Sequence, residues 1–204
     1  MTRLLLLMLA LLHGAATANP AESHKRPNLV IMVADDHRHD ALGVVQREQG
    51  EAARFPFLRT PHLDRLAAGG LRFRNAFVTH SLCSPSRATL LTGLHTHAHG
   101  ITTNEQPFRS KDSWPHLLAA AGWTTGYFGK WHMGNQRDRP GFQETATFLN
   151  QGVYNHCTFY VNGKETRSNG WVDDVSTTHA IDFMRRMKGR PFALHLGFKA
   201  PHDK

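Results

Sequence analysis

Paired carboxylates at Asp35 and Asp36 are the first residues along the chain whose type and spacing suggest chemistry. Carboxylate oxygens are the ligands that hard divalent cations such as calcium and magnesium prefer. An isolated Asp-Asp pair is more often a turn or a helix cap. The nearby His37 and His39 leave zinc as an alternative, although adjacent carboxylates favour the harder ions. The pair is therefore a candidate metal site.

A cysteine opens the segment Cys83–Arg87, which reads Cys-Ser-Pro-Ser-Arg. The segment begins a helix that we predict over residues 85–91, with Gly93 closing it. At the start of a helix, unpaired backbone N–H groups and the helix dipole favour negative charge. The chain has one other cysteine, Cys157, so a disulfide between the two is the alternative in an oxidising compartment.

Three polar clusters each follow a predicted strand. The aspartate pair follows the strand 28–34, Gly129–His132 follows the strand 123–128, and Pro201-His202 follows the strand 192–198. In open α/β sheets, ligands bind beyond the carboxyl ends of the strands. The three clusters therefore predict a single site at one edge of a sheet.

The elements that must position these clusters alternate between strands and helices. The aliphatic run 28–34 is typical of a strand buried on both faces of a parallel sheet. Helices are predicted from Thr60 to Gly69, over 85–91, from Ser113 to Gly122 and over 173–187, with Leu63, Leu66, Leu117, Leu118 and Ala121 facing inward. We expect an extended segment over 71–77, and loops or small excursions at the sheet edge over 136–170. This pattern predicts an α/β fold with a largely parallel or mixed central sheet.

The N-terminus has the features of an exported protein. Arg3, the apolar run Leu4–Leu12 and the small residues of Ala16-Thr17-Ala18 predict a cleaved signal peptide over residues 1–18, with an uncleaved anchor as the alternative. We expect a secreted or periplasmic domain over 19–204 that does not bind the membrane after cleavage. The net charge of +8 favours anionic ligands, but no motif accompanies it that would indicate nucleic acid.

Four motifs in order resemble the type I, formylglycine-dependent sulfatases, which include arylsulfatases and glycan sulfatases. They are Arg26–Asp36, Cys83–Gly93, Gly129–His132 and Phe192–His202. The resemblance implies a fold of the alkaline-phosphatase-like superfamily. We expect this chain to hold the N-terminal part of the catalytic domain, so that the fold is incomplete in it. Sulfatases are usually more than twice this long, so we expect further metal ligands and a sulfate-binding lysine elsewhere, and feeble activity from these 204 residues alone.

The resemblance also implies a sulfuric ester hydrolase with a modified nucleophile. In this family a maturation enzyme oxidises the cysteine to Cα-formylglycine, so Cys83 would become the residue that attacks sulfur once the aldehyde is hydrated. Asp35 and Asp36 would bind a calcium ion that also contacts the residue at Cys83. Arg87 would hold the hydrated aldehyde and neutralise charge.

The remaining roles fall on the later motifs. Lys130 would contact both the formylglycine and the sulfate, His132 would help release sulfate, and His202 would protonate the leaving oxygen. The substrate would be a sulfated carbohydrate or an aryl sulfate, and His97–Asn104 resembles bacterial relatives of glucosamine-6-sulfatases. A phosphatase or phosphonate hydrolase of the same superfamily, or an inactive module that binds anionic glycans, are the alternatives.

Overall fold

The computed structural model describes residues 26–203, so the predicted signal peptide lies outside the described residues. Its six-stranded sheet has the order β1-β6-β2-β3-β4-β5. The strands are β1 (Leu29–Val33), β2 (Thr124–Lys130), β3 (Glu144–Phe148), β4 (Thr158–Val161), β5 (Lys164–Arg167) and β6 (Phe192–Gly197). Strands β1, β6, β2 and β3 run parallel, whereas β4 and β5 are antiparallel to their neighbours. The mixed sheet confirms the predicted fold class.

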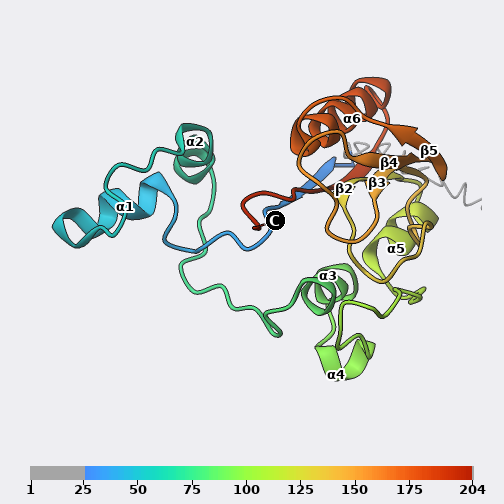
Figure 1. Cartoon of the computed structure of the whole chain (residues 1–204), viewed down its shortest axis with the longest axis horizontal. Helices are drawn as coiled ribbons and strands as arrows, with labels where there is room; N and C mark the ends of the chain where they lie inside the picture. The colour runs from blue at the N-terminus through green and yellow to red at the C-terminus, as the bar shows by residue number, and fades with distance from the viewer. Residues whose placement is uncertain (1–25, 204) are drawn as a thin grey trace, which may run out of the picture.

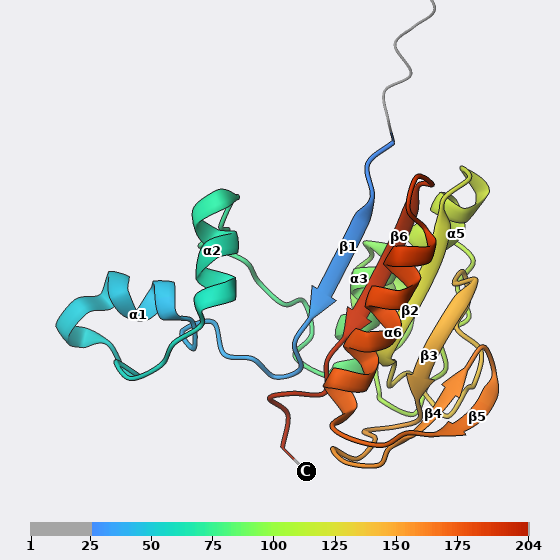
Figure 2. The same ribbon diagram turned by 90° about the horizontal axis from the view of Figure 1, so that it is seen from above.

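Helices cover both faces of this sheet (Figure 1). They are α1 (Gly43–Gln49), α2 (Pro61–Gly69), α3 (Cys83–Thr92), α4 (Thr96–His99), α5 (Trp114–Ala120) and α6 (Val172–Arg186), with a 3-10 turn, η1, at Gly50–Ala52. Helix α6 lies on one face, and α3 and α5 lie on the other (Figure 2). Helices α1 and α2 stand away from the sheet as a separate lobe.

The two faces of β2 and β6 carry separate cores because side chains alternate along a strand. Phe128 and Leu194 pack with Phe183 of α6 in one cluster. Tyr127 points the other way and packs with Leu91 of α3 in a second cluster. Strands β2 and β6, which lead to Lys130 and His202, are thus packed on both faces.

Strand β1 corrects the expectation of burial on both faces. Within the described residues it pairs with β6 alone, at the end of the strand order. Val30 is 45% exposed and Met32 is 52% exposed. A continuous aliphatic run therefore indicated the strand correctly but not its surroundings, since an edge strand lacks a neighbour on one side.

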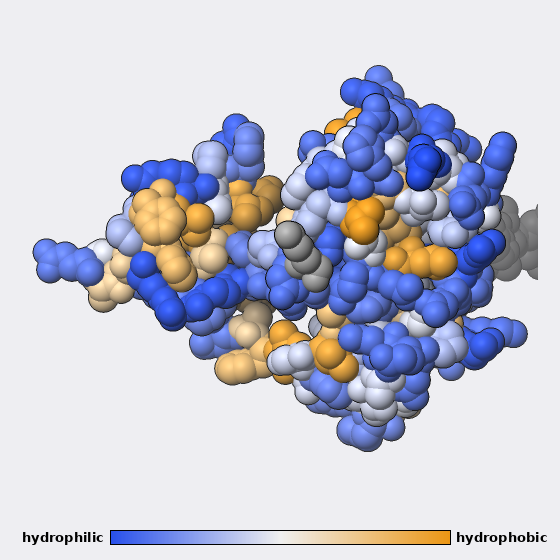
Figure 3. Space-filling model, viewed as in Figure 1, coloured by the Kyte–Doolittle hydropathy of each residue, from blue (hydrophilic) through white to orange (hydrophobic). Residues whose placement is uncertain are grey.

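The lobe of α1 and α2 corrects two further expectations. Leu63 and Leu66 are exposed, so neither faces inward as predicted. Polar contacts join α2 to α1: the Asp64 carboxylate accepts hydrogen bonds from the Val44 amide at 2.9 Å and from Arg47 Nη1 at 2.7 Å. No strand forms over 71–77. Apolar side chains of this region reach the surface beside the main body of the molecule (Figure 3).

Two other regions differ from their predicted form. Leu117 of α5 and Ala121, the residue after the helix, are exposed, so the prediction that they face inward is wrong for both, while Leu118 is partly buried. The segment 136–170, predicted as loops or small excursions at the sheet edge, does lie there but adds the strands β3, β4 and β5. All four residues of β5, which spans Lys164–Arg167, are exposed. Its sequence has no alternation of apolar and polar residues that would predict a strand.

His195 on β6 makes the fold sensitive to acid. It is 1% exposed, its ring stacks on Tyr127 with centroids 4.5 Å apart, and neither ring nitrogen has a hydrogen-bond partner within the described residues. Burial, with a smaller effect of the Arg87 charge, lowers the pKa of His195 to about 3. Below the ordinary pKa of histidine, His195 binds a proton in the unfolded chain but not in the folded one. The free energy of unfolding therefore falls as pH falls.

We therefore expect His195 alone to remove about 3 kcal/mol of unfolding free energy between pH 7 and pH 4.5. His195→Phe keeps an aromatic ring against Tyr127 but removes the titration. Urea denaturation at both pH values should show a smaller loss for this variant than for the unsubstituted protein. Equal losses for the two proteins would contradict the prediction.

Candidate active site

The predicted site residues lie at or beyond the carboxyl ends of the parallel strands, which Figure 2 shows at one end of the sheet. Asp35 follows β1, Lys130 ends β2, His202 follows β6, and Cys83 is the first residue of α3. The Asp35 amide donates to the Ala200 carbonyl at 3.2 Å, which ties the end of β1 to the segment after β6. Ligand atoms of Asp35, Cys83 and His202 all lie within 4.8 Å of one another.

Asp35 is the buried anion at the centre of this arrangement. It is 5% exposed, and its two carboxylate oxygens pair with Arg87 Nη2 at 3.2 Å and with Lys130 Nζ. Burial would raise the pKa of Asp35, but the charges and hydrogen bonds of Arg87 and Lys130 outweigh it and hold that pKa below its usual value. Burial lowers the pKa of Lys130 despite the pairing with Asp35. The site therefore holds an ionised carboxylate between two desolvated cations.

Arg87 is fixed in place by the end of β2. Its Nη1 donates to the Lys130 carbonyl at 2.7 Å and to the Tyr127 hydroxyl at 3.3 Å, and that hydroxyl donates to the same carbonyl at 2.6 Å. A β-carbon on Gly197 would lie 3.0 Å from Arg87 Nη1 and 2.6 Å from the Lys130 carbonyl oxygen. Glycine at 197 thus leaves the room that the guanidinium occupies.

Cys83 is half-buried in the first turn of α3. Burial raises the pKa of its thiol, so the unmodified side chain stays protonated near neutral pH. Reactive cysteines have lowered pKa values instead, which means that this residue is not prepared for thiolate chemistry as encoded. Cys157 is buried and also free, so the alternative of a disulfide between the two is not formed.

The start of α3 is anchored to the loop that carries His132. The Ser84 amide donates to Asn104 Oδ1 at 3.0 Å, and the Ser84 hydroxyl donates to the His132 carbonyl. His132 has a left-handed backbone with φ of 49°, and its buried Nδ1 has no hydrogen-bond partner among residues 26–203. Burial, then the charges of Lys130 and Arg87, lower the pKa of His132 to about 4. The imidazole is neutral at physiological pH.

His202 and Asp36 face each other at the rim. His202 Nε2 lies 3.6 Å from Asp36 Oδ2, and its Nδ1 lies 3.1 Å from Asp203 Oδ1. The Asp36 side chain is 64% exposed, and Asp36 lies outside the three-residue cluster formed by Asp35, Cys83 and His202. Its backbone has a φ of 58°, a conformation that is costly for a non-glycine residue and that clusters at functional sites.

The residues present fit a hard cation in part. Asp35 and Asp36 supply carboxylate oxygens, and Cys83 beside them would supply an oxygen in place of sulfur once oxidised. A cavity of about 360 Å³ opens over both aspartates, His37 and Cys83. Among residues 26–203, His37 and His39 join no cluster of three metal-binding side chains, so the structure gives the zinc alternative no support.

Four positioning residues escaped the sequence analysis. Tyr127 holds Arg87, Gln151 Oε1 accepts from Lys130 Nζ, the Tyr154 hydroxyl donates to the His202 carbonyl, and Asp173 accepts from two backbone amides beside His202. Each is a single polar residue outside the four motifs. Asp173 alone carried a signal, since an acidic residue in the first turn of a helix is a common stabilising feature.

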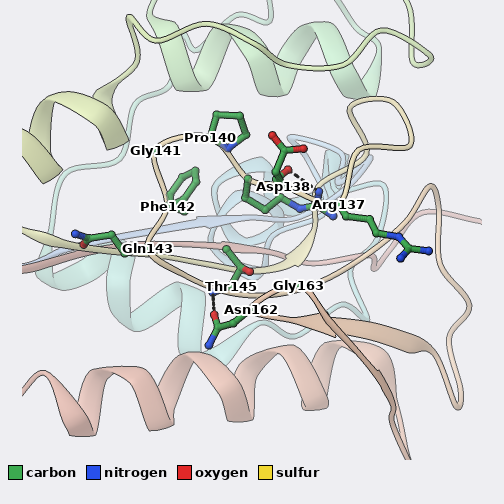
Figure 4. Close-up of a pocket in the computed structure, with 10 residues that line it drawn as sticks. Arg137, Asp138, Pro140, Gly141, Phe142, Gln143, Thr145, Asn162 and Gly163 are labelled. Carbon is green, nitrogen blue, oxygen red and sulfur yellow. Dashed lines mark hydrogen bonds between the residues drawn. The ribbon is translucent and has the colours of Figure 1, made fainter.

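A second cavity, of about 520 Å³, lies between the loop before β3 and the turn of the β4–β5 hairpin (Figure 4). Arg137, Phe142, Thr145 and Asn162 are among its lining residues. The Asn162 side chain accepts a hydrogen bond from the Thr145 amide at 2.7 Å. None of the predicted site residues lines this cavity.

Comparison with known proteins decides the family. The profile of the sulfatase family matches residues 27–204. This chain belongs to the sulfatase family. It is 36% identical to an N-acetylglucosamine-6-O-sulfatase of Bacteroides thetaiotaomicron, in an alignment that covers 97% of this chain and 35% of that protein. It is 41% identical to human arylsulfatase A, in an alignment that covers 63% of this chain and 24% of that protein. The chain thus spans about a third or less of the length of these two relatives.

Solved structures agree with this assignment. The structure of a protein in complex with its substrate, D-glucosamine-2-N,6-O-disulfate, superimposes with a TM-score of 0.78 at 35% identity, over 87% of this chain and 35% of that one. The fold is that of the alkaline-phosphatase-like sulfatases, as predicted. In the part of this sulfatase that the structure describes, no helix is long and apolar enough to cross a membrane.

Proposed function

We propose that this sulfatase hydrolyses sulfate monoesters, that its substrate is a sulfated carbohydrate, and that Cys83 acts as formylglycine. The observation that carries the proposal is the convergence of Asp35, Cys83 and His202 within 4.8 Å, with Arg87 and Lys130 paired to the same carboxylate. Ester cleavage at sulfur can use the groups that meet at this edge of the sheet: an anion, two cations, a modifiable nucleophile and a proton donor.

The two cations bind and orient a negatively charged sulfate. Lys130 and Arg87 are almost fully buried, so their charges act through a low dielectric and are screened little by water. Asp35 keeps both charged while no sulfate is bound. A sulfate oxygen that entered beside Cys83 would take over part of that pairing. Preorganised charge of this kind stabilises the transition state without reorganisation at the moment of reaction.

Proton transfer falls to the two histidines. His202 lies at the rim, beside Cys83, and is placed to give a proton to the alcohol oxygen that leaves. General acid assistance of this kind contributes about two to four orders of magnitude in rate. His132 is neutral and buried near Lys130, so it can serve as a neutral hydrogen-bond partner when sulfate is released.

Two groups complete the proposed chemistry. A calcium ion held by Asp35, Asp36 and the residue at position 83, with oxygen ligands from elsewhere in the protein, would neutralise charge on the sulfate oxygens. A hydrated formylglycine would supply one hydroxyl, whose oxygen would bond to sulfur. Loss of the proton from its second hydroxyl would re-form the aldehyde as the bond from carbon to the first oxygen breaks and sulfate is released. A formylglycine-generating maturation enzyme is therefore a required partner, and export through the predicted signal peptide would place the enzyme in the periplasm or outside the cell.

The relatives narrow the proposed substrate to amino sugars sulfated at the 6-position. One relative is named as a sulfatase of N-acetylglucosamine-6-O-sulfate, and a structural neighbour holds a 6-O-sulfated glucosamine as its substrate. Sulfate release from N-acetylglucosamine-6-sulfate by the matured, calcium-loaded protein should exceed release from galactose-4-sulfate by at least about tenfold, a difference of about 1.4 kcal/mol in transition-state binding. Ion chromatography of free sulfate measures both rates.

A chelator provides the control for this experiment. Removing calcium should abolish sulfate release from both sugars, and added calcium should restore it. Phosphate release from glucosamine-6-phosphate at a higher rate than sulfate release would favour a phosphatase instead. Undiminished sulfate release in excess chelator would count against the proposed metal site.

A further inference from the structure

Asp173, in the first turn of α6, forms hydrogen bonds to the backbone segment that leads to His202. It is 7% exposed, and its two carboxylate oxygens accept hydrogen bonds from consecutive backbone amides, those of Lys199 at 2.7 Å and Ala200 at 2.9 Å. The N-terminus of α6 and the segment after β6 lie at the same end of the sheet (Figure 2). One buried side chain thus ties a helix to the segment 199–202.

The backbone of Ala200 is also held on its carbonyl side, by Asp35, which follows β1. The Ala200 carbonyl accepts from the Asp35 amide at 3.2 Å, while the Ala200 amide donates to Asp173. Two residues on, the His202 amide donates to the Lys199 carbonyl at 3.0 Å. Hydrogen bonds at Lys199, Ala200 and His202 therefore hold the short backbone segment that joins the Asp173 contacts to His202.

Lys199 also helps to hold the segment 199–202 in place. Its side chain is 1% exposed, with Nζ 4.6 Å from the centre of the Tyr154 ring and 3.3 Å from the Asp203 carbonyl oxygen. The Tyr154 hydroxyl in turn donates to the His202 carbonyl. The backbone on both sides of His202 is thereby fixed, and Asp173 supplies the carboxylate in this set of contacts.

A carboxylate suits this position better than an amide does. Both oxygens of Asp173 accept, whereas asparagine would place one N–H₂ group against a backbone N–H and leave that buried donor unpaired. The helix N-terminus also favours a negative charge. Asparagine should therefore loosen the segment without removing the side chain.

We propose that Asp173 is a positioning residue that sets the place of His202 relative to Cys83 and Asp35. The proposal rests on the proposed function in so far as His202 is the proton donor. Reacting groups that shift by about 1 Å can lose about a hundredfold in rate, even when the substituted residue never touches substrate. Within the described residues Asp173 makes no hydrogen bond to the three clustered side chains, and the hydrogen bonds that link it to them pass through the backbone of residues 199–202.

The test compares Asp173→Asn with Asp174→Asn. Asp174 shares the first turn of α6 but is exposed and makes no side-chain hydrogen bond to this segment, so it is a matched control. Hydrogen exchange of the unmodified protein should show faster exchange at the Lys199 and Ala200 amides in the Asp173 variant alone. The amides of β2 should exchange as before, because the loss is local.

Turnover supplies the second readout. A nitrophenolate leaves readily without a proton donor, whereas a sugar alkoxide does not. Asp173→Asn should lower kcat on a sugar sulfate about a hundredfold, leave nitrophenyl sulfate within about threefold, and change KM for neither by more than about threefold. Should Asp173→Asn not fold, Asp173→Glu, which keeps both acceptors, should give the same pattern with smaller losses.

The outcomes separate the two proposals. Unchanged exchange at both amides, or equal losses on the two substrates together with faster exchange throughout the sheet, would overturn the role of Asp173. Absence of turnover in the unsubstituted, matured protein would count against the proposed function instead. The exchange data would then still show whether Asp173 holds the segment 199–202.

Discussion

Cys83→Ala is expected to abolish sulfate ester hydrolysis, with a fall of at least about four orders of magnitude in kcat, because the side chain that would attack sulfur is gone. The fold should be unaffected. Cys83 is only partly buried and belongs to neither hydrophobic core cluster, so its removal opens no cavity. Sulfate release from a sugar sulfate and urea denaturation measure the two effects.

Cys157→Ala is the control for the nucleophile. Cys157 is the other cysteine and is buried in the core beneath β3 and β4, so its truncation should cost stability but not turnover per folded molecule. Turnover retained in the Cys83 variant, or lost equally in both variants, would contradict the assignment of Cys83 as nucleophile.

Asp35→Asn should have the second large effect, on stability as well as on activity. The change leaves Lys130 and Arg87 buried without their carboxylate, which costs about 3–5 kcal/mol of unfolding free energy. It should also remove calcium affinity and sulfate release together, since a cage carboxylate is lost. Denaturation in urea, calorimetry with calcium and an activity assay give the three values.

The neighbouring Asp36→Asn separates metal binding from stability. Asp36 is exposed and pairs with neither cation within the described residues, so its change should leave the unfolding free energy within about 0.5 kcal/mol. Calcium affinity should still fall, because Asp36 is the second proposed carboxylate ligand. Equal stability losses from the two variants would contradict the buried ion-pair account, and unchanged calcium affinity in both would contradict the metal site.

Much of the site could be predicted from the sequence because its residues follow strands. Asp35 and Lys130 lie just after or at the end of a recognisable apolar run, and His202 lies a few residues beyond a third. Parallel strands bring such ends to one edge of the sheet. Cys83 stood out through the spacing of Pro85 and Arg87 after it. The structure places these groups together as the motifs implied.

The supporting contacts could not be predicted for a physical reason. Tyr127, Gln151 and Asp173 act through hydrogen bonds to residues distant along the chain, and one polar residue in a strand, turn or helix start carries no local signal of its partner. The exposure of β1 was missed similarly, since a strand's apolar sequence reports a preference for burial and not whether a neighbour is present.

The central claim is that position 83 carries an aldehyde and not a thiol in the mature protein. Mass spectrometry of the peptide that contains Cys83, from protein produced together with a formylglycine-generating enzyme, tests it most directly. We expect a peptide that is lighter by the mass difference between a thiol and an aldehyde side chain and that reacts with a hydrazide probe. A peptide found only as the free thiol, or joined to Cys157, in protein that nevertheless releases sulfate would contradict the account.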